Sequence, residues 1–230
     1  LDRGRRRGGL PGPGRDGVRP HSREHVWSTP AEQRVALDVD GVLLDFLGRW
    51  RERMEELFGE RPEQTGAYSL SERFHLCDHE VEAVWRRFSD RRDWGTLSLL
   101  PGAREWVEQA RESGLVTFAL TQLPRGLVPE RERNLREHGI GMPVVSRPEG
   151  DKAEALATDA RARFFVDDHI DHINRAREHL GAAIDLTHVQ AVDCSAIMAD
   201  RVVPHLGAFS ARELFVDIEP MASEEALPSP

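Results

Sequence analysis

The sequence is poor in several residue types and segments, and each shortage excludes a class of protein. Its two cysteines, Cys77 and Cys194, lie far apart and outside any Cys-x-x-Cys pair. That usage suits a reducing compartment and argues against structural zinc, so we expect a cytoplasmic protein. No apolar run approaches the length that spans a membrane, so we expect no membrane partner.

Lysine is almost absent, because Lys152 is the sole lysine and arginine supplies the other basic side chains. A single lysine in such a chain suggests a role that arginine does not fill, such as a compact point charge. The formal net charge of -9 argues against general affinity for nucleic acids, which are also negatively charged. Small phosphorylated metabolites remain suitable partners, and the oligomeric state is left open.

Length and composition predict one main domain between two loose ends. With 230 residues and 39% apolar content, the chain is long enough to bury a core. Residues 1–31 are rich in arginine, glycine and proline without hydrophobic periodicity, and we expect them to be disordered. That stretch also lacks the apolar segment of a secretory signal. Residues 217–230 are acidic and contain proline, so we expect a flexible tail.

Between these ends, predicted strands alternate with predicted helices. Apolar runs predict strands at residues 35–37, 116–120, near 144, 164–166 and 183–186. Helical spacing predicts helices over residues 102–113, 130–138, after 151 and over 170–180. This alternation is typical of a parallel sheet in a doubly wound α/β fold.

Two further predicted helices interrupt the alternation after the first strand. They cover residues 46–58 and residues 78 to about 88, the second with Asp78 as its cap. We therefore expect a small helical cap, residues 46–98, on a catalytic core of residues 32–45 and 99–216.

The first predicted strand ends in two acids, Asp38 and Asp40, followed by Gly41. Residues two apart on an extended segment point to the same side, so the two carboxylates should converge. In open parallel sheets, ligands bind in the crevice beyond the carboxyl ends of the strands. Two carboxylates beside an apolar core repel each other unless a cation joins them. The pair therefore favours a divalent metal together with an anionic substrate.

Other interpretations of this acid pair are weaker. An EF-hand calcium loop would need an acid at Val42, a glycine at Leu43 and a glutamate at Arg49. A solvated acidic turn does not fit directly after three core residues. So short a motif can also arise by chance, so further motifs in the chain are needed to assign a function to the acid pair.

Three later segments carry polar groups at predicted strand ends or a helix start. Thr121 and Gln122 end the second strand, Lys152 begins a helix, and Asp167 and Asp168 end the strand at 164–166. Each alone is a weak signal, because threonine also fits a turn, lysine a surface charge and the acids a helix cap. In this order, within one α/β domain, they form a strong joint signal.

These motifs resemble those of the haloacid dehalogenase-like hydrolase superfamily, over roughly residues 33–216. The segment Asp38-Val39-Asp40-Gly41-Val42 is similar to the first motif of that superfamily. Thr121 matches the second motif, Lys152 the third, and Asp167-Asp168 the fourth. Asp40 points to the phosphatase branch, because the dehalogenases lack that second acid.

The resemblance implies a mechanism and a metal. Asp38 would attack the phosphoryl group and form an aspartyl-phosphate. Asp40 would protonate the leaving oxygen and then deprotonate the water that hydrolyses the intermediate. Mg²⁺ would be held by the Asp38 carboxylate, the Asp40 carbonyl and Asp168, with Asp167 bound through water.

The resemblance also implies that Thr121, Gln122 and Lys152 bind the phosphoryl oxygens and offset their charge. A phosphotransferase or phosphomutase would use the same aspartyl-phosphate, and the motifs do not separate these from a phosphatase. A non-enzymatic binding module would be expected to lack an acid or the lysine, and none is missing.

Within the superfamily, the chain most resembles the 5′(3′)-deoxyribonucleotidases. The likeness lies in the run from Asp40 to Phe46, in Leu100-Pro101-Gly102-Ala103 and in the spacing from Asp167 to Asp171. Those enzymes usually have Ser-Pro after the threonine of the second motif, whereas this chain has Gln122-Leu123-Pro124. The resemblance implies a nucleoside monophosphate substrate with Phe46 facing it. The competing interpretation makes Phe46 the first core residue of the cap helix.

Two histidines and three tryptophans lie in or near these segments. His169 and His172 follow the second acid pair, but their spacing comes without the further ligands of a zinc site, so we expect a surface or hydrogen-bonding role. We expect Trp50, Trp85 and Trp94 in the core of the cap, where one of them could face substrate.

Overall fold

The computed structural model describes residues 30, 33–60, 63, 67–190 and 197–215. The predicted tails, 1–31 and 217–230, therefore lie outside the described residues, apart from residue 30. Within the described part, the helices are too short or too polar to cross a membrane.

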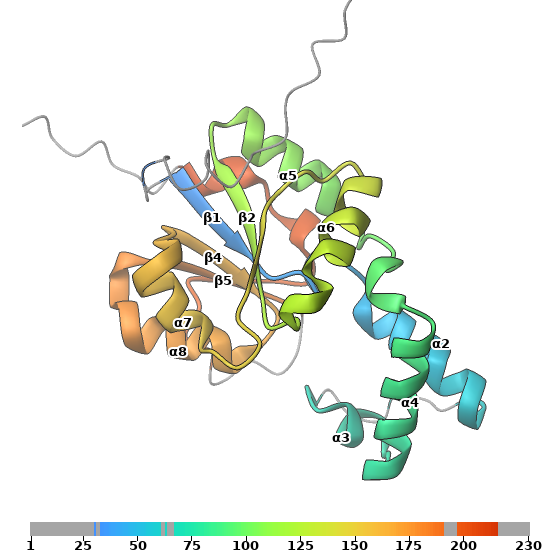
Figure 1. Cartoon of the computed structure of the whole chain (residues 1–230). Helices are drawn as coiled ribbons and strands as arrows, with labels where there is room; N and C mark the ends of the chain where they lie inside the picture. Colours follow the sequence, from blue (N-terminus) through green and yellow to red (C-terminus); the bar gives the residue numbers. More distant parts are fainter. Residues whose placement is uncertain (1–29, 31–32, 61–62, 64–66, 191–196, 216–230) are drawn as a thin grey trace, which may run out of the picture.

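A six-stranded sheet forms the centre of the molecule (Figure 1). Its strands are β1 (Arg34–Leu37), β2 (Val116–Thr121), β3 (Val144–Ser146), β4 (Phe164–Asp167), β5 (Asp185–Val189) and β6 (Arg201–Val203). They lie in the order β3-β2-β1-β4-β5-β6, and every neighbouring pair is parallel. The predicted doubly wound α/β fold is confirmed. The strand order reverses at β1, between β2 and β4, and in such sheets this is where ligands bind.

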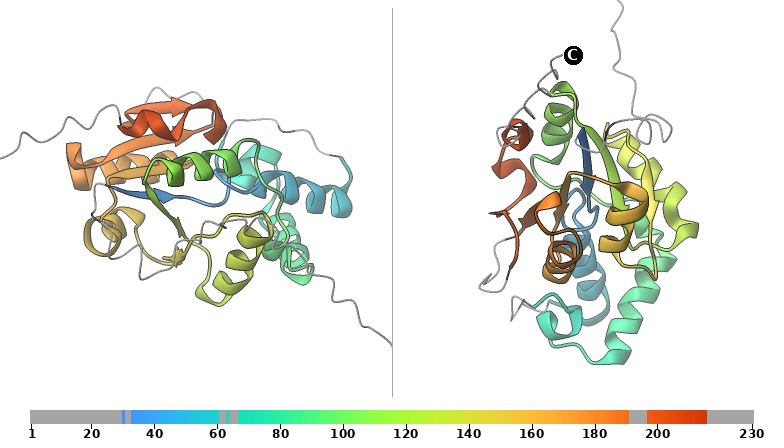
Figure 2. Two further views of the ribbon diagram at one scale, coloured as in Figure 1. Left: turned by 90° about the horizontal axis from the view of Figure 1, so that it is seen from above. Right: turned by 90° about the vertical axis from the view of Figure 1, so that its left-hand side faces the viewer.

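Helices cover both faces of the sheet (Figure 2). One face packs against α5 (Ala103–Glu112), α6 (Val128–Glu137), η6 (Leu206–Ala208) and η7 (Ala211–Phe215). The other packs against α7 (Lys152–Ala155), its continuation η4 (Leu156–Ala160) and α8 (Ile170–Leu180). Two short turns, η3 (Arg125–Leu127) and η5 (Gly181–Ala183), complete the connections.

The central strand β1 shows why its sequence is a continuous apolar run. Val35 and Leu37 belong to the core cluster on one face, and Ala36 belongs to the cluster on the other. All three side chains are fully buried, because helices cover both faces. This burial fixes the position from which Asp38 leaves the strand.

A group of helices between β1 and α5, which we call the helical insert, lies beside the carboxyl ends of the strands (Figure 1). It contains α2 (Phe46–Phe58), α3 (Leu70–Phe74), α4 (Asp78–Asp90) and η2 (Asp93–Gly95). The Asp45 side chain caps α2 by accepting a hydrogen bond from the Gly48 amide at 2.8 Å. The insert has a core cluster of its own around Trp50 and Met54.

The two segments that join the insert to the sheet pair with each other. Leu44 and Leu99 form an antiparallel bridge. The Asp45 amide donates to the Ser98 carbonyl, and the Leu100 amide donates to the Leu43 carbonyl, both at 2.9 Å. The insert is therefore attached through a paired, hydrogen-bonded stem.

Several element boundaries differ from the sequence prediction. Asp78 is the first residue of α4 and not its cap; Cys77 holds that position, and Glu80 accepts a hydrogen bond from the Cys77 amide at 3.0 Å. The strand expected at residues 183–186 begins at Asp185, because Gly181–Ala183 forms η5. Helix α3 and strand β6 were not predicted, since elements of five and three residues are too short to show a clear period.

Candidate active site

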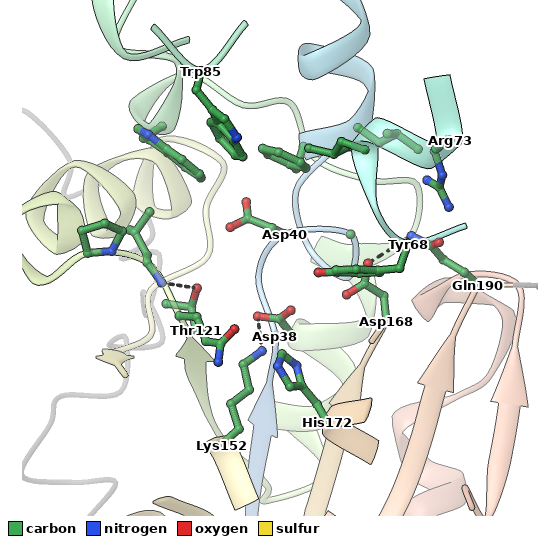
Figure 3. A pocket seen from close by; sticks show the side chains of 18 residues that line it. Asp38, Asp40, Tyr68, Arg73, Trp85, Thr121, Lys152, Asp168, His172 and Gln190 are labelled. Carbon is green, nitrogen blue, oxygen red and sulfur yellow. Dashed lines mark hydrogen bonds and ion pairs between the residues drawn. The ribbon is translucent and has the colours of Figure 1, made fainter. Parts of the chain in front are cut away.

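A cavity of about 440 Å³ lies between the carboxyl ends of the strands and the helical insert (Figure 3). Its size is typical of small-molecule sites. All but one of the predicted site residues line it: Asp38, Asp40, Phe46, Thr121, Gln122, Lys152 and Asp168. The exception is Asp167, which is fully buried and does not line the cavity.

Lys152 joins the two acid pairs. Its Nζ lies 2.8 Å from Asp38 Oδ1 and 2.8 Å from Asp167 Oδ2. The other contacts of Asp167 are the His169 amide at 2.8 Å and His172 Nδ1 at 3.2 Å. Asp167 therefore holds the ammonium and the start of α8 in place, and its oxygens are engaged by protein donors.

Burial and neighbouring charges shift the pKa values of Asp38, Lys152 and Asp167 in opposite directions. Burial raises the pKa of Asp38 to about 6; Asp167 and Asp40 add to the rise, whereas Lys152 opposes it. Burial alone would lower the pKa of Lys152, but Asp167 and Asp38 outweigh it and raise that pKa. Burial would likewise raise the pKa of Asp167, but Lys152 and His172 hold it well below its usual value. The ammonium is therefore charged and is held between carboxylates.

Three acids lie close enough to share a cation. One carboxylate oxygen from each of Asp38, Asp167 and Asp168 lies within 4.8 Å of the other two. Burial, with Asp38 and Asp167, raises the pKa of Asp168 well above its usual value. Gln190 Nε2 donates to Asp168 Oδ2 at 3.2 Å, and Oδ1 is buried without a hydrogen-bond partner among the described residues. Clustered, buried carboxylates of this kind fit an oxygen-preferring divalent cation.

Gly41 lets the Asp168 carboxylate approach the loop after β1. Its φ is +86°, and a Cβ built there would lie 2.1 Å from Asp168 Oδ2. Any side chain at this position would displace that carboxylate, so glycine is required both by the backbone angle and by the close contact.

Asp40 contacts an arginine that sequence reasoning did not identify. Nη2 of Arg131, a residue of α6, lies 2.8 Å from Asp40 Oδ1 and 3.1 Å from Oδ2. The Arg131 side chain is fully buried, and the Asp40 side chain is 23% exposed toward the cavity. No periodicity or motif distinguishes Arg131 from the many other arginines of the chain.

Thr121 and Gln122 form the side of the cavity at the end of β2. Thr121 Oγ1 accepts a hydrogen bond from the Leu123 amide at 3.2 Å. Gln122 Nε2 donates to the Gly150 carbonyl at 3.3 Å, so it ties the end of β2 to the loop before Lys152.

Aromatic rings from the insert form the opposite wall. Phe46, Trp85 and Trp94 line the cavity, and each pair of these rings has centroids 5.7–5.9 Å apart with interplanar angles of 28° or less. Trp50 is fully buried in the insert, as expected, whereas Trp85 and Trp94 face the cavity. Phe46 thus both lines the cavity and packs against core residues.

Other cavity residues had no specific role in the sequence prediction. Tyr68 and Arg73 come from the insert and line the cavity (Figure 3). The centroid of the Tyr68 ring lies 3.7 Å from that of the His169 ring. His172 is buried and contacts Asp167, in line with the expected hydrogen-bonding role. Gln190 directly follows β5, so the strand-end signal that found the acids could have found it.

Comparisons with known proteins place this geometry in a family. The family model described as 5′ nucleotidase, deoxy (pyrimidine), cytosolic type C protein matches residues 32–177, more than half of the chain. No protein with a curated description matches the chain.

Solved structures share the fold at low sequence identity. A HAD family hydrolase from Deinococcus radiodurans R1, with bound phosphate and sodium, has a TM-score of 0.53 and 16% identity, covering 80% of this chain and 93% of that one. A predicted phosphoglycolate phosphatase from Haemophilus somnus 129PT has a TM-score of 0.53 and 17% identity, covering 77% and 96%.

The match over most of the core, with the acids, the lysine and the threonine around one cavity, identifies an enzyme of the phosphatase type. The chain belongs to the 5′ nucleotidase, deoxy (pyrimidine), cytosolic type C protein family of the haloacid dehalogenase-like superfamily.

Proposed function

We propose that the protein hydrolyses phosphomonoesters through an aspartyl-phosphate on Asp38. The observation that carries this proposal is the position of Asp38 at the cavity wall, 2.8 Å from the buried ammonium of Lys152 and two residues before a second cavity acid. An Asp38 oxygen forms a bond to phosphorus while the bond to the leaving oxygen breaks. Lys152 and Thr121 bind the phosphoryl oxygens and offset their charge.

Asp40 moves the proton in both steps. In the first step its carboxyl proton passes to the leaving oxygen. In the second step it takes a proton from the attacking water, while the bond between phosphorus and Asp38 breaks and releases phosphate. Its position supports this role, because it faces the cavity two residues beyond the nucleophile.

The acids support a Mg²⁺ site. Asp38, Asp168 and the Asp40 carbonyl would hold the ion, and Asp167 would bind through water. The crowding of three carboxylates, the raised pKa of Asp168 and the close approach of Asp168 to Gly41 all fit such a cation. When bound, the ion offsets negative charge on the phosphoryl group.

We propose (deoxy)nucleoside monophosphates as the substrates. The three stacked rings of Phe46, Trp85 and Trp94 offer a flat apolar surface opposite the acids, and base stacking on aromatic side chains contributes about 1–3 kcal/mol per base. The substrate in the family description supports the same choice. In this account the helical insert acts as a cap that closes the cavity, and the cytosolic type named for the family supports a cytoplasmic location.

A substrate screen tests this function. Phosphate release is measured from nucleoside monophosphates, sugar phosphates and small phospho-acids, with Mg²⁺ and with EDTA. We expect nucleoside monophosphates to give the highest kcat/KM, activity to be lost in EDTA and restored by Mg²⁺, and Asp38→Asn to be inactive. Full activity in EDTA would overturn the metal assignment, and preference for sugar phosphates would overturn the substrate.

A further inference from the structure

The contact between Arg131 and Asp40 is unusual because the arginine has few other partners. Its Nε and Nη1 are buried and have no hydrogen-bond partner among the described residues. The guanidinium carbon also lies 5.5 Å from the centroid of the Trp94 ring, a cation–π contact. Buried donors without acceptors cost about 1–3 kcal/mol, and a buried charge needs good pairing. The fold therefore retains a costly side chain whose polar contact is to Asp40.

We propose that Arg131 is a positioning residue that fixes the orientation of the Asp40 carboxyl group for proton transfer; this inference rests on the proposed function. Arg131 Nη2 donates a hydrogen bond to Asp40 Oδ2 at 3.1 Å and also lies 2.8 Å from Oδ1. One guanidinium nitrogen therefore contacts both carboxyl oxygens and restricts the rotation of the Asp40 side chain at the cavity wall.

The place of Arg131 in the fold suits this role. It belongs to α6, which is anchored on the sheet by Leu135, and its guanidinium lies against Trp94 of the aromatic wall. Helix α6 contacts η2, the segment that carries Trp94. The Asp40 carboxyl is therefore held from helix α6 as well as by its own loop. Without the guanidinium, the Asp40 side chain loses this anchor.

Two substrates separate positioning from simple structural damage. p-Nitrophenyl phosphate has a leaving group that departs without a proton, whereas a nucleoside 5′-monophosphate has an alkoxide that needs one. Rapid acid quench measures the rate of phosphoenzyme formation with each. We expect Arg131→Met to slow formation from the nucleotide by at least about tenfold, a part of the 10²–10⁴ that general acid catalysis supplies. With p-nitrophenyl phosphate the rate should stay within about twofold of wild type.

Matched variants complete the design. Arg131→Lys keeps a donor and should recover part of the rate on the nucleotide. Arg133→Met removes an exposed arginine of the same helix, which pairs with Glu137, and should leave both rates unchanged. The melting temperature of each variant shows whether it is folded.

A double-mutant cycle with Asp40→Asn asks whether Arg131 acts through Asp40. If it does, adding Arg131→Met to Asp40→Asn should change the rate with the nucleotide by less than about twofold. An equal loss on both substrates, or a further large loss in the Asp40→Asn background, would overturn the positioning role. Wild-type enzyme that forms no phosphoenzyme would overturn the proposed function, and the Arg131 assignment with it.

Discussion

At the scale of single residues, the site depends on how buried charges of both signs are balanced. Lys152 is fully buried, with two carboxylates at 2.8 Å from one nitrogen. A compact ammonium can meet Asp38 and Asp167 at a single point, whereas a guanidinium would bring further donors that need acceptors. This geometry gives a physical reason for the one lysine in a chain whose other basic side chains are arginine.

The close contact of Gly41 with Asp168 predicts a selective loss of metal binding. Both Gly41→Ala and Gly59→Ala force a residue with a Cβ to adopt positive φ, at a cost of roughly 1–3 kcal/mol. Each should therefore lower the melting temperature by a few degrees, at roughly 2–4 °C per kcal/mol. At Gly59 the added Cβ meets nothing within 4 Å, whereas at Gly41 it displaces Asp168.

Differential scanning fluorimetry with and without Mg²⁺ provides the measurement. Wild type and Gly59→Ala should gain melting temperature with Mg²⁺, because the ion binds only the folded state. Gly41→Ala should lose most of that gain. A full Mg²⁺ response in Gly41→Ala would contradict the predicted ligand role of Asp168.

Substitution of Phe46 should raise the KM for nucleotides more than the KM for other substrates. Phe46→Leu removes a stacking surface but keeps an apolar side chain in the insert. We expect KM for a nucleoside monophosphate to rise by about tenfold, from loss of part of the 1–3 kcal/mol of base stacking. KM for glycerol phosphate should change by less than about twofold.

Phe58→Leu is the matched control, because Phe58 ends the same helix and does not line the cavity. It should leave both KM values unchanged. Equal increases in KM for the two substrates in Phe46→Leu would favour the competing interpretation, in which Phe46 is only a core residue of the insert.

At the scale of elements, strand ends carried most of the information that the sequence holds about the site. Asp38, Thr121 and Asp168 were predicted because each lies at or just beyond the end of an apolar strand, and β1, β2 and β4 are neighbours in one parallel sheet. Arg131 and Tyr68 were missed, because they reach the cavity from a helix face and a loop whose orientation no periodicity encodes. Asp167 was predicted to bind the metal through water, and in the structure its carboxylate accepts hydrogen bonds from Lys152 and the His169 amide.

The contacts of Asp93 join η2 to α2 within the insert, and they lead to a prediction about stability. This buried acid of η2 accepts hydrogen bonds from Arg49 Nη1 at 2.8 Å and from Arg53 Nε at 2.6 Å. Burial opposes ionisation, but the hydrogen bonds from Arg53 and Arg49 outweigh it and lower the pKa of Asp93. Asp93→Asn should reduce the free energy of unfolding by about 1.5–3 kcal/mol at neutral pH, as expected for hydrogen bonds to a charged group.

The same contact predicts a pH dependence with a definite sign. Because the pKa of Asp93 is lower in the folded state, its contribution is complete above the unfolded pKa of about 3.9 and is lost as pH falls toward the folded value. Urea unfolding should therefore show a smaller gap between wild type and Asp93→Asn at pH values below about 4 than at pH 7. Asp90→Asn, an exposed acid at the end of α4, should show no such gap. A gap that grows on acidification would contradict this account.

At the scale of the whole molecule, two parts of the chain form the cavity, and one of them is inserted in the sequence of the other. The sheet supplies the acids and the lysine, the insert supplies the aromatic wall, and a paired stem joins them. The alternation of strands and helices predicted the sheet, and the two further helices predicted after the first strand correspond to α2 and α4. Short elements such as α3 and the detailed cavity lining needed tertiary contacts, which a single sequence does not display.

The central claim is that Asp38 becomes phosphorylated, and it can be measured directly. Asp40→Asn enzyme is mixed with p-nitrophenyl phosphate and Mg²⁺, quenched in acid, digested with pepsin and analysed by mass spectrometry. Because this substrate loses its leaving group without a proton while hydrolysis of the intermediate needs Asp40, the phosphoenzyme should accumulate. We predict one phosphoryl group on the peptide that contains Asp38, and none in the Asp38→Asn variant. A phosphoryl group on another residue, or sustained turnover by Asp38→Asn, would contradict the account.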